Sequence, residues 1–307
     1  MKPTHPVSRR CFLKAAAAGT ASVGLARPLR AGLQKPAVVV GAHPWVYAAR
    51  LPRNDITPAL PQIFADMSYA GMGGIELMHT ALRPDDAVAR IGALSRKHDL
   101  PVPGMSFGGE MWDRAKHREV LADAKLVIPR LAQLGGRTMG TSVGAVSWGG
   151  KIRKTPAQLD AQADLLRKLI ALCQQHGIVL NLHNHTYEVA NDLYDLKGTL
   201  ARIPDVKLGP DLNWLIRGGV DPAAFIRRFR DRIVFMHLRD QKKDGRWSEA
   251  MGEGDTDFVA IAAALKEIHF RGLAVIELAW EANFKPTRPV RESLKMSREF
   301  VRRTMGY

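Results

Sequence analysis

Cysteine is scarce in this chain, which has two cysteines among 307 residues. Cys11 lies in an N-terminal segment that we expect to be removed, which would leave Cys173 alone in the mature chain. A single cysteine cannot form an internal disulfide, so the fold must be stable without one. The lack of thiolates also excludes the soft-metal sites that depend on clustered cysteines.

Sequence features typical of nucleotide and nucleic-acid binding are also missing. The first apolar run, "VVVGAHPWVY", contains no G-x-G-x-x-G, which argues against a dinucleotide-binding fold. The formal net charge is +15, and it falls to +9 without residues 1–31, which hold six basic and no acidic residues. The other basic residues are scattered and form no stripe with aromatics, so they indicate solvated faces and no nucleic-acid partner.

The chain has no long hydrophobic run, and its N-terminus carries another kind of pattern. "SRRCFLKAAAAGTASVGLA" joins the twin arginine Arg9-Arg10 to a weakly hydrophobic stretch. This resembles a twin-arginine export signal, so we expect a signal in residues 1–31, cleavage after Ala26 or Ala31, and a periplasmic location. The alternative is a basic, disordered tail. The apolar stretch is too short and too rich in small residues to predict stable membrane insertion.

Eight short apolar runs alternate with longer amphipathic segments from residue 37 onward. The predicted strands cover residues 37–42, 74–77, 101–107, 137–142, 178–185, 206–212, 233–240 and 273–280. Helical periodicity covers residues 59–71, 84–98, 116–134, 156–176, 191–203, 257–269 and 287–304, and Asp221-Pro222 begins a further helix. Strands that alternate with helices in this way predict parallel βαβ units.

Eight such units of uniform composition predict an α/β fold, a closed (β/α)8 TIM barrel formed as a single domain by residues 32–307. A doubly wound open sheet is the rival, but it usually has fewer units and a glycine-rich phosphate loop. Local signals support the helices. Thr155 and Gln158 form a capping box around Pro156 at the start of the predicted helix over residues 156–176, and Gly177 ends it.

Polar residues gather at the ends of five predicted strands, where a TIM barrel builds its active site. They are Glu76, His79, His183, Asn184, His185, Asp211, Asn213, His237, Arg239, Asp240, Glu277 and Glu281. Any one of them could be a hydrogen-bonded core residue or an exposed strand end. Several that converge from neighbouring strands favour a metal site, because a carboxylate or imidazole buried alone is costly. Mixed carboxylate and imidazole donors suit Mn²⁺, Zn²⁺, Co²⁺ or Mg²⁺.

Six motifs follow one another over essentially the whole mature chain, namely "GIEL", "LHNH", "PDLNW", "FMHLRD", "GEGDTDF" and "VIELAWE". In this order they resemble the xylose isomerase-like barrel superfamily, the sugar phosphate isomerase and epimerase group. The resemblance implies one divalent metal ion held by an acid at strand five, Asp at strand six, His at strand seven and Glu at strand eight. By motif position these become His183, Asp211, His237 and Glu277. His183 is a departure, because many members have glutamate there.

The resemblance also implies proton abstraction next to a carbonyl on a sugar, keto-sugar or polyol. Family epimerases place two metal-bound glutamates on opposite sides of the sugar as base and acid. Glu277 is the expected base here, and His185, Glu76, Glu110 or Glu188 could stand opposite it. An isomerase or epimerase is the preferred function. If no partner is in reach, a metal-dependent lyase or dehydratase on an oxidised sugar or 3-keto-glycoside is the alternative.

Further side chains are expected to bind the carbohydrate, namely His79, Asn213, Trp214, Arg239 and Trp112. The tryptophans would stack on sugar faces or pack at the rim. His183 and His185 share one face of their strand. His183 is the first choice for the metal ligand and His185 for substrate binding or proton transfer, with the reverse assignment left open. Glu253 or Asp255 of "GEGDTDF" would help to shape the site.

Two other classes of function stay open. A non-catalytic sugar-binding barrel is favoured by the histidine in place of an acid at residue 183. A phosphodiesterase like the DNA-repair endonucleases of this fold would need several metals, yet Trp214 stands where that family has a histidine. The D-x-H pair that follows the strand-seven histidine in that family is also missing. The expected partner is therefore a small carbohydrate, and homo-oligomer formation is left open.

Overall fold

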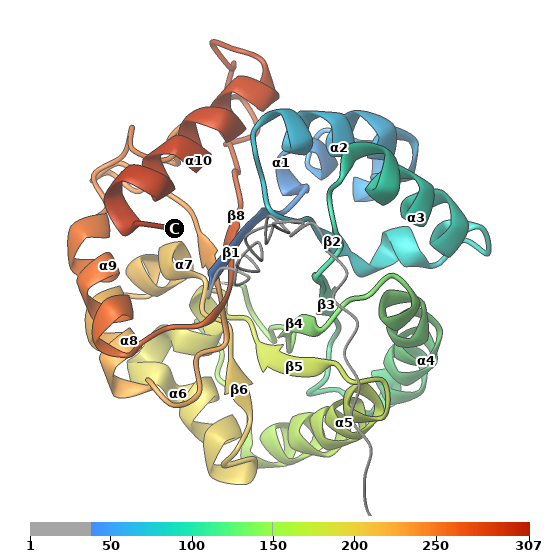
Figure 1. Ribbon diagram of the computed structural model, residues 1–307. Coiled ribbons are helices and arrows are strands. Elements are labelled where there is room, and N and C mark those ends of the chain that lie inside the picture. Colours follow the sequence, from blue (N-terminus) through green and yellow to red (C-terminus); the bar gives the residue numbers. More distant parts are fainter. Residues whose placement is uncertain (1–37, 149) are drawn as a thin grey trace, which may run out of the picture. The chain divides into compact units, whose positions relative to one another are not determined.

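Eight parallel strands form a closed barrel in the computed structural model, which describes residues 38–148 and 150–307 (Figure 1). They are β1 Val38–Ala42, β2 Glu76–Met78, β3 Gly104–Gly108, β4 Thr138–Ser142, β5 Val179–Leu182, β6 Lys207–Leu208, β7 Phe235–Leu238 and β8 Gly272–Ile276. The strands pair in the orders β2-β3-β4-β5-β6 and β1-β8-β7. Parallel bridges from Ala42 to Ile75 and from Leu208 to Ile233 join the two sheets into a ring. The expected (β/α)8 fold is confirmed.

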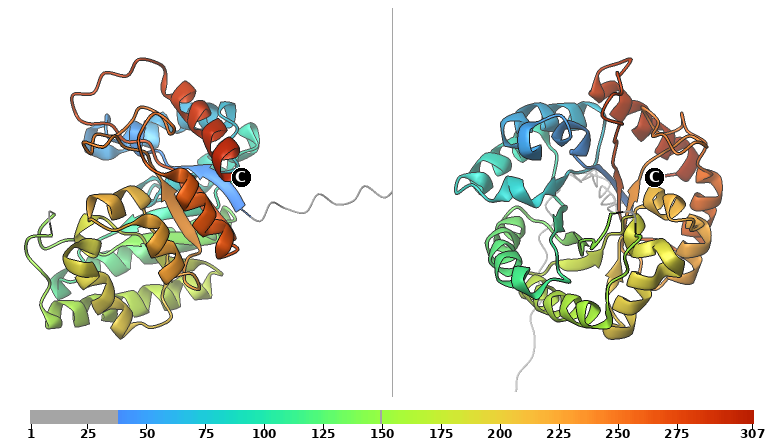
Figure 2. Two further views of the ribbon diagram at one scale, coloured as in Figure 1. Left: turned by 90° about the vertical axis from the view of Figure 1, so that its left-hand side faces the viewer. Right: turned by 180° about the vertical axis from the view of Figure 1, so that it is seen from behind.

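Helices surround the barrel on its outside, as the views along and across its axis show (Figures 1 and 2). They are α1 Trp45–Ala48, α2 Leu60–Tyr69, α3 Ala87–His98, α4 His117–Gln133, α5 Pro156–Gln175, α6 Thr186–Arg202, α7 Leu212–Arg217, α8 Pro222–Arg228, α9 Phe258–Glu267 and α10 Val290–Met305. The predicted capping box of α5 is present, with Thr155 accepting a hydrogen bond from Gln158 N. No helix among the described residues is long and apolar enough to span a bilayer.

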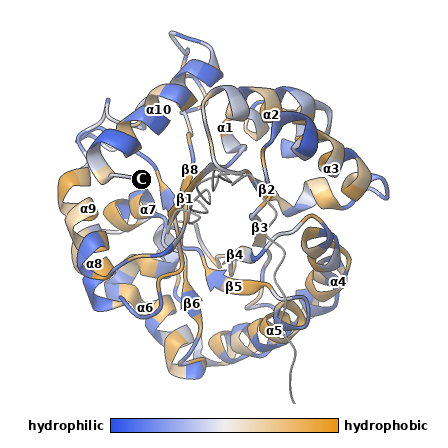
Figure 3. Ribbon diagram, in the orientation of Figure 1, coloured by the Kyte–Doolittle hydropathy of each residue, from blue (hydrophilic) through white to orange (hydrophobic). Residues whose placement is uncertain are grey.

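The main core lies between the strands and the helices. In α2, for example, Leu60, Ile63, Phe64 and Met67 are fully buried and recur at helical spacing. Figure 3 shows the resulting pattern, in which apolar residues concentrate on the strands and the inner faces of the helices. Burial of this continuous layer is the main stabilising contribution to the fold.

Strand alternation separates this layer from a small apolar cluster inside the barrel. Met236 and Leu238 of β7 belong to the outer layer, whereas Phe235 packs with Leu273 and Val275 of β8 in the inner cluster. Side chains two residues apart on a strand share a face. The residues that follow Phe235 and Val275 on the inner face are therefore His237 and Glu277, at the C-terminal mouth.

The close contact between β1 and the segment that leads into β2 requires glycine. A Cβ atom on Gly41 would lie 2.9 Å from the carbonyl oxygen of Gly74, and one on Gly74 would lie 2.8 Å from Cδ of Pro103. Here the backbones approach closely, and Ala42 N donates to Gly74 O at 3.1 Å. Glycine lets β1 and β2 meet without a side chain between them.

The structure shortens the predicted strands from β2 to β8, and the physical reasons are clearest for β5 and β6. Strand β6 has only two residues because Pro210 has no N–H to donate and Asp211 begins the turn into α7. Strand β5 ends at Leu182, and His185 is already the N-cap residue of α6. That helix begins at Thr186, earlier than predicted, and its first turn is followed by three residues with positive φ, Asn191, Asp192 and Leu193. The predicted signal and domain boundary lie outside the described residues and stay predictions.

Candidate metal centre and active site

The registers of the strands bring polar side chains together at the C-terminal mouth of the barrel. Asp211 forms a parallel bridge with His237, so these two residues lie side by side. His237 pairs with Val275, and Glu277 follows Val275 on the same face. The C-terminal mouth is where TIM barrels place their active sites.

A cavity of about 380 Å³ opens at this mouth. It is lined by His43, Trp45, Glu76, Met78, His79, Ser106, Phe107, Gly108, Gly140, Ser142, Trp148, His183, His185, Trp214, His237, Arg239, Trp247 and Glu277. Its size suits a small organic ligand. Eight of the side chains that the sequence singles out therefore reach one cavity, from strand ends far apart in the chain.

Three side chains of this region form a group that could hold a metal ion. One ligand atom from each of His183, Asp211 and His237 lies within 4.8 Å of the other two. Nδ1 of His183 and Oδ2 of Asp211 are buried without hydrogen-bond partners. A buried polar atom without a partner is costly unless something binds it. Two imidazoles and a carboxylate are the side chains that ligate divalent metals. The residues present therefore fit the metal that the resemblance implies.

Asp211 uses its two carboxylate oxygens differently. Oδ1 accepts hydrogen bonds from the backbone N–H groups of Asn213 at 2.9 Å and Trp214 at 3.0 Å, which caps the N-terminus of α7. Oδ2 has no hydrogen-bond partner and lies 3.8 Å from Nδ1 of His237. The cap fixes the orientation of the carboxylate, so that Oδ2 faces the imidazoles.

His237 lies between two carboxylates. Its Nε2 is 2.5 Å from Oε2 of Glu76, and its Nδ1 is 2.8 Å from Oε2 of Glu277. Burial lowers the pKa of His237, but the negative charges of Glu76 and Glu277 outweigh it and raise that pKa to about 10. A carboxylate on one ring nitrogen orients the imidazole and leaves the other nitrogen for a ligand. Glu76 is placed to do this for His237.

Glu277 is an ionised carboxylate in this arrangement. Burial raises its pKa, but Arg239 and then His237 outweigh it and hold that pKa well below its usual range. Nη2 of Arg239 lies 2.8 Å from Oε1 of Glu277 and 3.5 Å from Oδ2 of Asp211. Glu277 therefore keeps its negative charge at neutral pH, as either a metal ligand or a proton acceptor must.

The two histidines after β5 both line the cavity and differ in their surroundings. Burial, and then the positive charge of His237, hold the pKa of His183 well below its usual range. Burial lowers the pKa of His185 to about 4. His185 N donates to Oε2 of Glu188 at 2.7 Å, and the His185 ring stacks on that of Tyr187. Both imidazoles are neutral, and only His183 belongs to the metal group.

Removing the two histidines one at a time separates their roles. We expect His183→Ala to weaken metal binding by more than the roughly 10- to 100-fold cost of losing an outer-shell partner. His185→Ala should leave metal affinity within a few-fold of the unaltered protein, because its ring lies outside the His183, Asp211 and His237 group. Metal titration by calorimetry measures both. The opposite pattern would make His185 the ligand.

His43 and Ser106 are among the cavity residues that were not predicted from the sequence. His43 Nε2 lies 2.9 Å from Ser106 Oγ, and its Nδ1 lies 3.7 Å from Oε1 of Glu277. The backbone N–H of Trp45 donates to Nδ1 of His43, so Nε2 carries the proton and donates to Ser106. This tautomer does not activate a serine nucleophile. His43 could have been predicted as a site residue, because it directly follows the first apolar run, just as the other strand-end residues follow theirs.

Other predicted residues lie around the cavity or away from it. His79 lines it, and its Nδ1 is 3.2 Å from Ser106 O. Asn213 is fully buried beside it, where its side chain donates to Gln241 and accepts from Nε1 of Trp247. Trp112 is not among the residues that line the cavity. Its role as a sugar-binding residue stays a prediction.

Asp240, which follows β7, has a structural role. Its carboxylate accepts hydrogen bonds from the backbone N–H groups of Gln241, Gly252, Gly254 and Thr256. These bonds close the loop that runs from Gln241 to Thr256 and that contains "GEGDT". Trp247 lies in this loop, so the loop forms part of the cavity wall. Glu253 and Asp255 are absent from the cavity lining.

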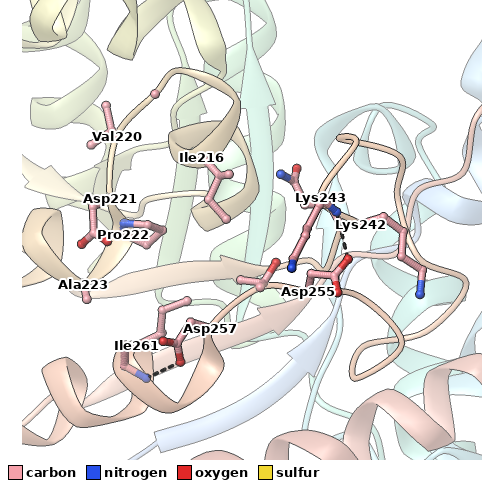
Figure 4. Close-up of a pocket in the computed structure, with 14 residues that line it drawn as sticks. Ile216, Val220, Asp221, Pro222, Ala223, Lys242, Lys243, Asp255, Asp257 and Ile261 are labelled. Carbon is pink, nitrogen blue, oxygen red and sulfur yellow. Dashed lines mark hydrogen bonds between the residues drawn. The ribbon is translucent and has the colours of Figure 1, made fainter.

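A second cavity, of about 460 Å³, lies beside the N-terminal ends of α8 and α9 (Figure 4). Its acidic side chains already make local hydrogen bonds. Asp255 accepts from the backbone N–H of Lys243 at 2.9 Å, and Asp257 caps α9 by accepting from Ala260 N. None of the predicted metal ligands lines it. Its larger volume therefore does not make it the candidate active site.

The fold and the cavity define a TIM barrel with a mixed histidine and carboxylate site at its C-terminal mouth. The family model described as "Xylose isomerase-like TIM barrel" matches residues 64–300. The chain belongs to that family.

Three similar proteins illustrate the range of this fold. An inosose dehydratase of Geobacillus kaustophilus is 27% identical over 176 residues, which are 50% of this chain and 56% of that protein. The rhizopine catabolism protein MocC of Rhizobium meliloti is 25% identical over 254 residues, 73% of this chain and 76% of that one. The crystal structure of the 3-keto-D-glucoside 4-epimerase YcjR from E. coli has a TM-score of 0.67 at 19% identity, covering 85% of this chain and 99% of that one.

The match to the inosose dehydratase spans only a little over half of that protein's length. The likeness to YcjR, at 19% identity, concerns the fold.

Proposed function

We propose that the protein is a divalent-metal-dependent isomerase or epimerase that acts on a sugar, keto-sugar or polyol. The observation that carries the proposal is the His183, Asp211 and His237 group, with Glu277 beside it, at a cavity of small-ligand size that His183, His237 and Glu277 line. A divalent ion held there would polarise a substrate carbonyl and make the neighbouring C–H acidic. The mixed imidazole and carboxylate donors suit Mn²⁺, Zn²⁺, Co²⁺ or Mg²⁺.

The side chains of the cavity divide the remaining work. Glu277 is ionised and takes the proton from carbon at one carboxylate oxygen, while Arg239 and His237 hold that carboxylate in place. Glu76 keeps the His237 ring oriented through Nε2. His185 is neutral and lines the cavity, so it is the proposed partner for a substrate oxygen or for proton return. His79 and Trp214 line the cavity as well and would contact the sugar.

A metal-dependent lyase or dehydratase on an oxidised sugar or 3-keto-glycoside is the second candidate. The observation that favours it is the nature of the cavity carboxylates. Among the described residues, Glu76 and Glu277 are the carboxylates that line the cavity, and Glu76 is held against His237. If Glu76 serves to orient His237, Glu277 alone remains to act as a base, which suits abstraction and elimination on one side of the ring. The similarity to an inosose dehydratase agrees with this candidate.

The more distant alternatives have weaker support. Within residues 38–148 and 150–307, His183, Asp211 and His237 are the one group that could hold a metal, whereas the phosphodiesterase chemistry expected from the resemblance needs several. A non-catalytic sugar-binding barrel would not need an ionised Glu277 beside the metal group. Plasmid nicking at an abasic site tests the first of these alternatives, and the following experiment tests the second.

Incubation of the metal-loaded protein with candidate keto-sugars and inososes in D₂O tests the proposal. An isomerase or epimerase incorporates deuterium at the carbon next to the carbonyl and returns a sugar of equal mass apart from the label. A dehydratase instead releases water and forms an unsaturated product with an ultraviolet absorbance. A stoichiometric metal without exchange or elimination in any substrate would contradict both enzymatic proposals and favour a binding protein.

We also propose that residues 1–31 direct export by the twin-arginine route to the periplasm. The support is the "SRRCFLK" pattern and the alanine-rich stretch after it. Replacing Arg9 and Arg10 with lysine should retain the protein in the cytoplasm, as cell fractionation with a fused reporter would show. Unchanged export would make the pattern a basic tail.

A further inference from the structure

Four tryptophans line the cavity, and each lies in the segment that follows a different strand. Trp45 follows β1, Trp148 follows β4, Trp214 follows β6 and Trp247 follows β7. The polar side chains of the cavity are those of the strand ends, which lie at its base. The tryptophans belong to the segments around that base, so the cavity has a polar end and an aromatic rim.

Two of these tryptophans form a rigid wall. Nε1 of Trp247 donates to Oδ1 of Asn213 at 2.8 Å, and the backbone N–H of Trp247 donates to Glu281 at 3.0 Å. Trp214 meets Trp247 edge to face, with ring centroids 5.8 Å apart. The guanidinium of Arg217 lies 4.2 Å from the centroid of the Trp247 ring. This wall is held by the protein itself and needs no ligand for its order.

Trp148 differs from these because it is 70% exposed. Its ring stands edge-on to His185 at 5.3 Å and to Tyr187 at 5.5 Å, so it continues the aromatic surface from His185 outward. Single exposed apolar side chains are common on proteins and need no function. Trp148 is distinguished by its position, since it lines the cavity, whereas the exposed Ile152 of the same connection does not.

We infer that the substrate carries a second ring, so that the site takes glycosides whose reacting sugar lies at the polar end and whose attached ring packs on Trp148. This rests on the proposed function. The rings of His185 and His183 connect Trp148 to His237, with successive centroids 5.3, 4.9 and 4.8 Å apart. A single sugar ring placed against Glu277 and His237 would therefore leave the exposed indole face uncovered. The apolar C–H face of a second sugar ring, or an aromatic aglycone, is the chemical group that an indole ring stacks with.

Binding of three glucosides to the purified, metal-loaded protein tests the inference. Methyl β-D-glucopyranoside has one ring, whereas phenyl β-D-glucopyranoside and cellobiose add an aromatic ring or a second sugar ring. We expect each two-ring probe to bind about tenfold more tightly than the methyl glucoside, as measured by calorimetry or ligand-detected NMR. Trp148→Ala should remove this preference and leave the dissociation constant of the methyl glucoside unchanged. Trp148→Phe should restore part of it.

Ile152→Ala is the matched control, because Ile152 is 61% exposed in the same connection and lies outside the cavity lining. It should not change the preference. An equal loss for all three probes in Trp148→Ala, no loss for any, or a failure of all three to bind would overturn the inference. Because this experiment measures binding and not turnover, the inference and the proposed function can be contradicted independently of each other. Deuterium exchange without tighter binding of the two-ring probes would contradict only the binding of a second ring at Trp148. Tighter binding of those probes without exchange would contradict only the proposed chemistry.

Discussion

Replacing Glu277 with glutamine is expected to reduce deuterium exchange into the substrate by roughly 10²- to 10⁴-fold, the usual loss when a general base is removed. Glutamine has nearly the same shape, so the fold should persist, but it cannot take a proton from carbon. It also cannot balance the charges of Arg239 and His237, which lie 2.8 Å from the carboxylate of Glu277. Exchange rates in D₂O, compared at saturating metal, measure the effect.

Glu281→Gln is the matched control for Glu277→Gln. Glu281 lies four positions further along the same chain segment, and its carboxylate accepts a hydrogen bond from Trp247 N at 3.0 Å. A glutamine oxygen can accept the same bond. Exchange should therefore stay within a few-fold of the unaltered protein. Full exchange in Glu277→Gln would show that another group, with His185 the first to examine, removes the proton.

Asparagine in place of Asp211 is expected to abolish the stabilisation of the protein by metal while leaving the metal-free fold nearly unchanged. The oxygen that caps α7 is retained, because asparagine is as good an N-cap as aspartate. The charge of the unpartnered Oδ2 is lost, and burial already disfavours that charge by raising the pKa of Asp211. We expect the metal-free stability to change by less than about 1 kcal/mol.

Calorimetric unfolding with and without metal measures this result. A ligand at 100 times its dissociation constant stabilises the native state by about 2.7 kcal/mol, and Asp211→Asn should lose most of that increment. Asp221→Asn is the control, since Asp221 caps α8 in the same way by accepting from Ala224 N but lies outside the metal group. If Asp211→Asn were stabilised by metal as strongly as Asp221→Asn, Asp211 would not be a ligand.

The barrel could be predicted from the sequence because each strand is short, apolar and followed by a helical pattern. The strand-end residues were predictable for the same reason, since the alternation along a strand fixes which side chains share a face. The prediction was weakest where the chain leaves regular structure. Nothing in the periodicity of residues 191–203 shows that Thr186 begins a helical turn and that three left-handed residues follow it.

Trp214 of the cavity rim was predicted from the sequence, but Trp148 and Trp247 could not be predicted in this way. Trp148 and Trp247 lie in connections, where their distance from the strand ends depends on the path of the loop and not on a sequence period. The partners of Glu76 and Asn213 were equally hidden, because His237 is 161 residues from Glu76 and Trp247 reaches Asn213 through a loop. Pairings of this kind follow from closure of the barrel, which a local pattern does not encode.

The anchoring of one loop by Asp240 has a consequence for how the cavity could diversify. Three of the four N–H groups bound by its carboxylate, those of Gly252, Gly254 and Thr256, lie beyond the turn in which Lys242 N pairs with Arg246 O. Insertions or deletions in that turn would leave this anchor intact. Related barrels could therefore exchange the length and residues of the turn next to Trp247 and acquire new ligand preferences, while inheriting the strand-end chemistry unaltered.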